Sequence, residues 1–245
     1  WQQVLEQGLP GALMAEETGG SGASWLEVSP VLRAIGYWSA PLPLSETMLA
    51  SLLLARAGLE VPEEPITLIQ IGRLGDLALT AEGHLKGRVF NVPWARSSRW
   101  AVVASDAGQL ALVDLRQSTI SLEAGSNFAG EERDTLHFAD AHIHAIGQLQ
   151  IADVQEPVWL FGALIRTSML VGALESSLDK AVGYANERAQ FGKAIGKFQA
   201  IQQQLAQMAG AIAAARMATQ VALRSACEAL QAEAGTHSCL AFDVA

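Results

Sequence analysis

The hydrophobic period of this chain changes twice, and the order of the periods limits the folds open to it. Residues 1–61 carry helical spacing, interrupted by a glycine-rich loop at 16–22, and a helix is expected near Glu46 to Ala57, ended by Gly58. Residues 66–146 carry short runs of branched residues separated by Gly, Asp, Asn and Ser, as in an antiparallel sandwich or barrel. From Pro157 the chain is alanine-rich and helical again. Because strands and helices do not alternate, this order disfavours a doubly wound parallel sheet and predicts an α+β fold.

The same pattern predicts three domains. They are an N-terminal helical domain at 1–61, a middle antiparallel β-barrel or sandwich domain at 66–146, and a C-terminal helical bundle domain at 157–245. The segment AEGHLKGR (81–88) predicts a hairpin turn inside the middle domain. The chain begins and ends inside apolar patterns without caps, so we expect the bundle to be truncated and the sequence to belong to a longer protein.

Two helices are expected in the bundle. The first, over about 158–190, is apolar nearly all round as far as Leu174, so we expect it to be buried on most sides. The second has apolar residues spaced 3, 4, 3 and 4 apart, which is typical of a bundle seam, namely Phe198, Ile201, Leu205, Met208 and Ile212. Most glutamines of this helix lie off the seam.

Composition excludes some function classes. The formal net charge of −9 disfavours nucleic acid as a partner, since a phosphate backbone is repelled by that sign. The apolar runs are broken by charge or Gly before they reach membrane-spanning length, so we expect no membrane span. Cys227 and Cys239 have no metal-ligand spacing, which suits a reducing cytoplasm. His142 and His144 are expected on one face of a possible strand, but no third ligand is near in the sequence, so no metal site is predicted.

The stretch after Glu187 concentrates binding chemistry. Arg188 offers a planar fork for a phosphate or carboxylate, and Phe191 offers a flat face for a heterocycle. Gly192 permits close approach of a ligand, and Gln190 and Gln199 can both donate and accept hydrogen bonds. Together they suit a nucleotide-bearing cofactor. The alternative is a helix–helix corner, in which Arg188 pairs with a carboxylate, Phe191 packs in the core and Gly192 is a helix C-cap.

The stretch YANERAQFGKAIGKFQAIQQQLAQMA (184–209) resembles the acyl-CoA dehydrogenase family, through the pattern Tyr-Ala-x-x-Arg-x-Gln-Phe-Gly-Lys-x-Ile followed by Phe-Gln-x-x-Gln and Leu-Ala-x-Met. GLPGALMAEETGGSG (8–22) is similar to the N-terminal entry of that family, and GALESSLDKAVGYANER (172–188) to the helix leading into the motif. The order of helical, β and helical regions is also that of the family.

The resemblance implies an enzyme that holds FAD between subunits and removes two hydrogens from the α and β carbons of an acyl-CoA. It implies that Arg188, Gln190 and Phe191 meet the diphosphate and adenine of a neighbouring subunit's FAD, with Phe198 and Gln199 beside the same cofactor. It further implies a cytoplasmic homo- or hetero-tetramer that serves fatty acid or steroid degradation and passes electrons to an electron-transfer flavoprotein.

The sequence also departs from the family. The Thr-Glu-Pro and Gly-Ser-Asp segment that holds the flavin ring in typical members is absent from 66–79, and residues 91–93 are a loose stand-in for the Trp-Ile-Thr segment. The usual catalytic carboxylate would lie beyond Ala245. The alternative glutamate of some members is replaced by Gly162 or Ala163, so no catalytic residue is assigned in this chain.

Two other charged residues lie on the same helix. Glu175 is expected at a salt bridge or a helix end. Ala163 stands where many members have an arginine; Arg166, one turn later, either substitutes for it or pairs with a carboxylate.

Three functions therefore stay open. The first is a dehydrogenase subunit acting on an acyl-CoA. The second is a non-catalytic partner that completes another chain's FAD site in a heteromeric enzyme. The third is a relative that uses its flavin for oxygen chemistry. A carboxylate in the residues beyond Ala245 would favour the first over the second.

Overall fold

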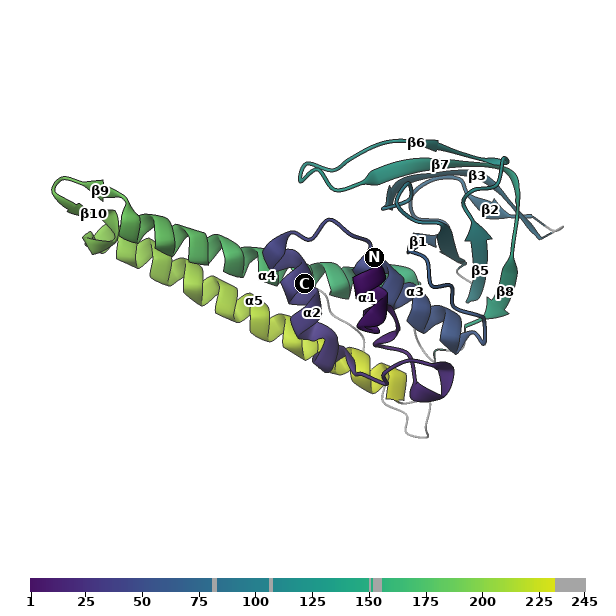
Figure 1. The fold of residues 1–245 in the computed structure, drawn as a ribbon, viewed down its shortest axis with the longest axis horizontal. Helices are drawn as coiled ribbons and strands as arrows, with labels where there is room; N and C mark the ends of the chain where they lie inside the picture. The colour runs from purple at the N-terminus through teal and green to yellow at the C-terminus, as the bar shows by residue number, and fades with distance from the viewer. Residues whose placement is uncertain (81–82, 106–107, 150, 152–155, 232–245) are drawn as a thin grey trace. The chain divides into compact units, whose positions relative to one another are not determined.

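The computed structural model describes residues 1–80, 83–105, 108–149, 151 and 156–231 (Figure 1). It confirms the predicted α+β class. The chain packs as two compact units, one containing residues 1–24 and 41–162 and the other residues 25–40 and 163–228. The three-domain division stays a prediction. Cys239 and the last part of the predicted bundle lie outside the described residues, as do positions 81–82 of the predicted hairpin turn.

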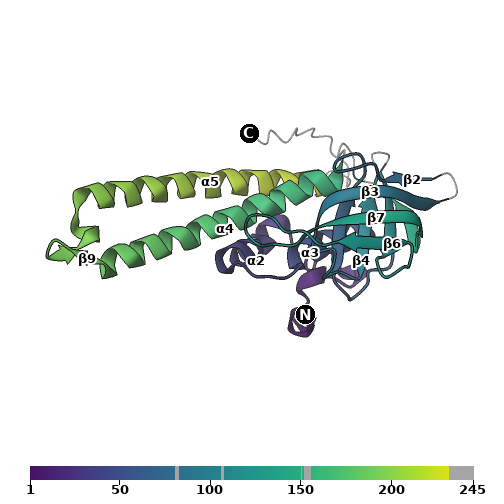
Figure 2. The same cartoon turned by 90° about the horizontal axis from the view of Figure 1, so that it is seen from above.

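Two open four-stranded sheets form the β region of the first unit, and they do not close into a barrel (Figures 1 and 2). One sheet has the order β1 (Ile66–Gln70), β4 (Trp100–Ala104), β5 (Gln109–Asp114) and β8 (Ala145–Gln148). The other has the order β2 (Ala78–Leu79), β3 (His84–Pro93), β7 (Arg133–His142) and β6 (Ile120–Glu123). Every pairing within these two sheets is antiparallel except that of β1 with β4, which is parallel and was not predicted.

The core of the β region is shared by both sheets. Val103 and Val113 come from the first sheet, and Val89, Leu136 and Phe138 from the second, and all five are at most 4% exposed. In β7 the buried Leu136 and Phe138 alternate with the half-buried Thr135 and His137, which is the period-two pattern that predicted these strands. The sandwich is therefore held by side chains that the two sheets bury against each other.

Helical segments complete the first unit. They are α1 (Gln2–Glu6), two 3-10 helices at Leu9–Gly11 and Glu16–Thr18, and α3 (Leu44–Arg56). Helix α3 packs on β1 and on the first 3-10 helix, and its residues 44–54 are all buried. It ends as predicted at Gly58, where φ is +69° and the Leu59 amide donates to the carbonyl of Leu54 at 3.0 Å. That bond closes the helix with a left-handed glycine cap.

The second unit is built from α2 (Trp25–Trp38), most of α4 (Pro157–Glu187) and α5 (Gln199–Gln231). Helices α4 and α5 run antiparallel and are joined by a short hairpin (Figure 2). The predicted seam is confirmed, since Ile212 is buried and Phe198, Ile201, Leu205 and Met208 are half-buried. The glutamines expected off that seam are exposed, at positions 199, 202, 203, 204 and 207.

Helices α2 and α4 contact each other at two glycines, Gly36 and Gly172. A methyl group built at Gly36 would overlap the carbonyl oxygen of Met169, and one built at Gly172 would overlap that of Arg33. The two backbones therefore touch where neither carries a side chain. Arg33 also donates to Glu175 at 2.9 Å, and the Tyr37 hydroxyl donates to Asp179 at 2.7 Å. The salt bridge expected at Glu175 is confirmed.

Helix α4 confirms one expectation and contradicts another. Over residues 157–174 most side chains are buried or half-buried, as predicted, while Trp159, Leu170 and Leu174 are 47%, 62% and 41% exposed. An all-round apolar pattern shows that a helix can be covered but does not say by what. The helix is also long and apolar enough to cross a membrane, so the expectation that no apolar run reaches that length is wrong. Core helices of soluble proteins meet the same criterion, which makes it weak support for a membrane span.

Candidate functional site

The stretch singled out in the sequence forms a tight hairpin between α4 and α5. Strand β9 (Ala189–Gln190) pairs with β10 (Lys193–Ala194), with Gln190 opposite Lys193. Phe191 and Gly192 form the two-residue turn, with φ values of +52° and +79°. Positive φ at both central positions is what a type I′ turn requires, and Asn-Gly is the sequence that usually meets it.

Phe191 is an unusual residue for that turn. A side chain other than glycine in the left-handed region costs on the order of 1–3 kcal/mol, and such strain concentrates at functional sites. Phe191 gains little burial in return, because it is 92% exposed. The helix-corner alternative is therefore wrong for two residues: Phe191 does not pack in a core, and Gly192 lies in a hairpin turn rather than at a helix C-cap.

A small cluster supports the exposed ring. A 3-10 helix at Ile195–Lys197 follows β10 and leads into Phe198. The rings of Phe191 and Phe198 meet edge to face, with centroids 6.3 Å apart, and Lys193 Nζ lies 4.3 Å from the Phe198 centroid. Each such contact contributes on the order of 0.5–1 kcal/mol. Phe198 therefore supports one part of the Phe191 ring, and the rest of that ring is open to solvent.

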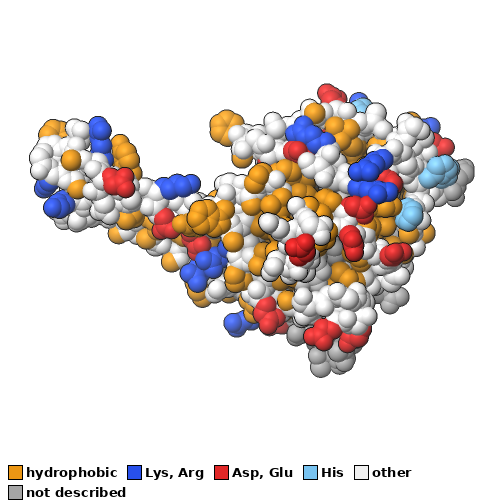
Figure 3. All heavy atoms as spheres, viewed as in Figure 1, with side chains coloured by type: hydrophobic (Ala, Val, Ile, Leu, Met, Phe, Trp, Pro, Cys, Tyr) orange, Lys and Arg blue, Asp and Glu red, His pale blue; other side chains and the backbone are white. Residues whose placement is uncertain are grey.

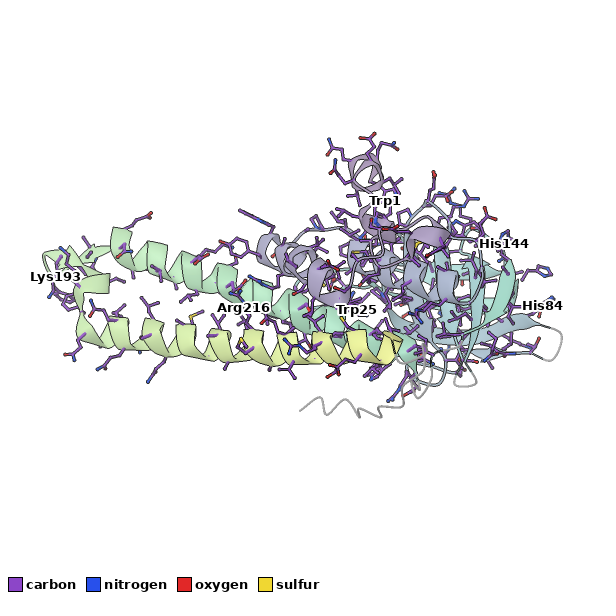
Figure 4. The ribbon with its side chains drawn as sticks, turned by 90° about the horizontal axis from the view of Figure 1, so that it is seen from below. Trp1, Trp25, His84, His144, Lys193 and Arg216 are labelled. Carbon is purple, nitrogen blue, oxygen red and sulfur yellow. The ribbon has the colours of Figure 1, made fainter. Side chains whose placement is uncertain are left out.

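The hairpin is positively charged, whereas the whole chain carries a net negative charge. Arg188, Lys193 and Lys197 are exposed, and Glu187 is the one acidic residue in 187–199, in a chain whose net charge is −9. Lys193 points from the hairpin in Figure 4, and Figure 3 shows the blue side chains gathered at this end of the helix pair. The backbone of Arg188 is bonded, since its carbonyl accepts from the Ile195 amide at 2.9 Å. Within the described part of the chain, its guanidinium has no hydrogen bond or ion pair.

The start of α5 adds to this potential. Its first residue is Gln199, and the N-terminus of a long helix carries a partial positive charge with amide groups that lack helical partners. Gln202 Nε2 donates to the carbonyl of Gly196 at 2.9 Å, which ties the first turn of α5 to the 3-10 helix before it. The site thus combines side-chain cations with a helix N-terminus, an arrangement that suits an anion.

The structure places all five predicted residues on one hairpin and its exit. It brings Phe191 and Phe198 into contact, while Gln190 lies in β9 and Gln199 is the first residue of α5. Their roles in cofactor binding stay predictions. Lys193 and Lys197 were missed, although the Gly-Lys pair directly after Phe191 and the lysine before Phe198 were visible in the sequence.

The loop after β1 carries a different cluster, in the segment where typical members of the resembled family hold the flavin ring. Arg73 Nε donates to Glu156 Oε1 at 2.7 Å, and a second nitrogen of Arg73 bonds the other carboxylate oxygen. The guanidinium also lies over the ring of Trp159, 4.9 Å from its centroid. The hydrogen bond from Arg73 lowers the pKa of Glu156 below its ordinary value. The Arg73 side chain of this loop is therefore bound by two other residues of the same chain, Glu156 and Trp159.

The histidine pair set aside in the sequence is split between the two sheets. The His142 ring lies against His84, with centroids 4.4 Å apart, whereas His144 packs against Trp100 at 4.9 Å. The idea that both share one strand face is wrong, because β7 ends at His142 and the amide of His144 bonds Leu112 of β5. Among the residues described, no group of three or more His, Cys, Asp or Glu could hold a metal.

Comparisons with known proteins show which sequences and structures the chain is similar to. Residues 161–239 match the family described as acyl-CoA dehydrogenase, C-terminal domain. The chain is 28% identical to the acyl-CoA dehydrogenase IpdE2 of Mycobacterium tuberculosis over 88% of this chain and 62% of that protein. It is also 28% identical to the acyl-CoA dehydrogenase FadE27 of the same organism, over 84% of this chain and 61% of the relative.

Solved structures show the same fold. The ChsE4–ChsE5 complex from Mycobacterium tuberculosis superposes with a TM-score of 0.77 at 26% identity, over 92% of this chain and 68% of that chain. A glutaryl-coenzyme A dehydrogenase in complex with glutaryl-CoA superposes with a TM-score of 0.77 at 21% identity, over 93% of this chain and 68% of that one. The chain thus spans about 62% of the length of the curated relatives it matches first. Residues 161–239 thus match the C-terminal domain of the acyl-CoA dehydrogenase family, and the chain as a whole is similar to acyl-CoA dehydrogenases in sequence and fold.

Proposed function

We propose that this chain is a subunit of an enzyme that dehydrogenates an acyl-CoA with FAD, and that residues 188–199 bind the diphosphate and adenine of that FAD. The observation that carries the proposal is Phe191, a strained and 92% exposed aromatic residue three positions after Arg188, whose guanidinium has no hydrogen bond or ion pair among the described residues. A turn that served the fold alone would place Asn or Gly at that position.

The residues present fit this part of the cofactor. A diphosphate carries negative charge that Arg188 can bond in a bidentate manner, and Lys193, Lys197 and the α5 N-terminus attract it. The open face of Phe191 suits an adenine ring, with Gln190 and Gln199 available for its polar edges. When bound, FAD supplies the chemistry that accepts the two hydrogens of the substrate.

The hairpin offers half of such a site. Arg188, Gln190, Phe191 and Gln199 are exposed and Phe198 is half-buried, so these residues are accessible to a ligand that another chain also contacts. The flavin ring needs other walls, which we assign to another chain. Tetrameric assembly, homo- or heteromeric, and a cytoplasmic location with electron-transfer flavoprotein as acceptor belong to the same proposal. The base for the α proton is placed outside residues 1–245, since Gly162 and Ala163 carry no carboxylate.

A second candidate is a partner subunit that completes another chain's FAD site without catalysing the reaction itself. The Arg73–Glu156–Trp159 cluster favours it, because this cluster closes the loop where typical members hold the flavin ring. The similarity to the ChsE4–ChsE5 complex also supports it, since that structure contains two different chains. Both candidates use the hairpin in the same way.

The visible absorption spectrum of the purified protein, without oxygen and before and after a mixed set of acyl-CoAs, separates the candidates. A flavin band that bleaches supports a dehydrogenase. A protein without flavin that gains a band on mixing with the chain encoded beside it supports the partner role. A protein that takes up no flavin alone or with any candidate partner contradicts both.

A further inference from the structure

The turn between β6 and β7 places a phenylalanine fully in solvent. The side chain of Phe128 is 110% exposed, so the fold gives its ring no burial. Because single exposed apolar residues are common on protein surfaces, this exposure alone does not indicate a function. The turn that carries the ring and a hollow at the base of the same turn supply two further observations.

Hydrogen bonds fix the turn below this ring. Asn127 Oδ1 accepts from the amides of Ala129 and Glu131, both at 3.0 Å, and Asn127 Nδ2 donates to the Glu131 carboxylate at 3.0 Å. The amide of Asn127 also donates to the carbonyl of Glu131 at 2.9 Å. A side chain on an ordered turn loses little entropy when a partner encloses it, and this is a property of binding anchors.

The hollow at the base of the turn is large enough for an aromatic ring. Its volume is about 350 Å³, and its walls come from β6, from the residues that follow β5 and from the β3–β4 turn at 95–99. Arg96 joins the hollow to the turn, because it lines the hollow and donates to the carbonyl of Gly125 at 3.1 Å. Ring and hollow therefore belong to one end of the same sandwich.

The lining combines apolar side chains with arginine, and members of both kinds are accessible. Leu122 lines the hollow and is 41% exposed. Arg116 also lines it and is exposed, and its guanidinium has no hydrogen bond or ion pair among the described residues. An aromatic ring gains from both, since its apolar body packs on leucine and its negative face attracts a guanidinium. This mixed lining fits a ring better than it fits a purely apolar group.

We propose that the hollow of one copy of this chain receives Phe128 of a second copy, in a reciprocal contact. Because ring and hollow lie at one end of the same sandwich, a two-fold axis between two copies places each ring in the other hollow. One enclosed ring buries about 150–250 Å², well below the roughly 1,200 Å² of a stable interface. The contact is therefore one anchor within an assembly and not its only interface.

This contact is separate from the cofactor site. It names a surface for the proposed assembly of several chains, and it assigns that surface to a second copy instead of a different subunit. It uses no residue of the hairpin at 188–199, so its loss should leave the FAD bound per chain unchanged. A test that reads covalent cross-links by mass, and not flavin, can fail or succeed independently of the FAD proposal.

A photoreactive group at position 128 tests the contact directly. A tagged chain carrying Phe128→p-benzoylphenylalanine is co-expressed with the unaltered chain bearing a different tag, and the purified protein is illuminated. We expect a covalent product with both tags, in which mass spectrometry places the cross-link within residues 95–99 or 115–122. A cross-link to any other part of the chain, or no product with both tags, would overturn the proposal.

Leu122→Glu tests the hollow itself. A carboxylate there removes apolar lining and competes for Arg116, so the cross-link yield should fall at least about tenfold, the loss expected for one enclosed aromatic anchor. Ile146→Glu is the matched control, because Ile146 is a 49% exposed residue of β8 that does not line the hollow, and its yield should be unchanged. Equal yields in the two variants would contradict the contact.

Arg116→Ala keeps the test decisive if Leu122→Glu does not fold. Arg116 is exposed, so its loss does not threaten the core. The cross-link yield should fall about two- to fivefold, the range for one cation–π contact. Arg224→Ala, at an exposed arginine of α5, should leave the yield unchanged. A normal yield in Arg116→Ala would show that the ring does not meet this guanidinium and would count against the proposal.

Discussion

The α2–α4 crossing and the β9–β10 hairpin lie in the same unit, but they differ in which residues take the unusual backbone positions and in whether their arginine is paired. At the crossing, two glycines bring backbones into contact and Arg33 is paired with Glu175. At the hairpin, a phenylalanine takes the conformation that glycine or asparagine would suit, and Arg188 has no pair among the described residues. The residues at the crossing stabilise the fold, whereas the exposed residues of the hairpin stay available for a ligand. Substitutions in the two regions should therefore separate folding from binding.

The largest effect is expected at Gly172. Gly172→Ala should lower the free energy of unfolding by about 3 kcal/mol, because the new methyl group overlaps backbone that cannot move aside cheaply. Urea unfolding followed by circular dichroism measures it. Gly183→Ala in the same helix is the matched control, since nothing lies within 4 Å of a methyl group there. The control should gain about 0.5–1 kcal/mol from helix propensity, and equal effects at both positions would refute the tight crossing.

The ion pair at the crossing should matter less. Arg33→Ala leaves the carboxylate of Glu175 mostly covered and without its partner, so we expect a loss of about 1–3 kcal/mol. The double variant Arg33→Ala/Glu175→Ala should lose less than the sum of the single variants. Purely additive losses in a double-mutant cycle would show that the pair contributes nothing to the crossing.

Phe191→Asn should have the smallest effect on stability. Asparagine relieves the strained turn, while loss of the contact with Phe198 costs about 0.5–1.5 kcal/mol, so the two changes nearly cancel. Bound FAD should nevertheless fall several-fold, because the stacking face is gone. Phe128→Asn, at another fully exposed phenylalanine, should change neither quantity. A large loss of stability in Phe191→Asn would mean that the ring serves the fold instead.

The sequence predicted most elements because their signals are local. The seam of α5 and the glycine end of α3 depend on residues a few positions apart, and both are confirmed. The pairing of β1 with β4 and the contact of α2 with α4 join segments far apart in the chain, and periodicity does not choose such partners. Glu175 was correctly expected in a salt bridge, but its partner Arg33 is 142 positions away.

The same limit explains the errors at the site and at the histidines. A helix corner was one interpretation of residues 188–198, because the turn of a two-residue hairpin usually has the sequence Asn-Gly and not Phe-Gly. His142 and His144 were placed on one strand, whereas the chain leaves β7 between them. Hydropathy predicted that most of the first part of α4 is covered, but it does not say which side stays open, and Trp159, Leu170 and Leu174 are exposed there.

The central claim is that the hairpin binds FAD, and the FAD bound per chain tests it most directly. It should be measured by absorbance and protein concentration in the Arg188→Ala variant, using the protein or its complex with any partner chain it requires, beside Arg216→Ala as a control for an exposed arginine on α5. We predict that Arg188→Ala lowers FAD occupancy at least about tenfold while its unfolding free energy changes by less than about 0.5 kcal/mol, and that Arg216→Ala changes neither. Full FAD occupancy in the Arg188→Ala variant would contradict the assignment of this hairpin to the cofactor.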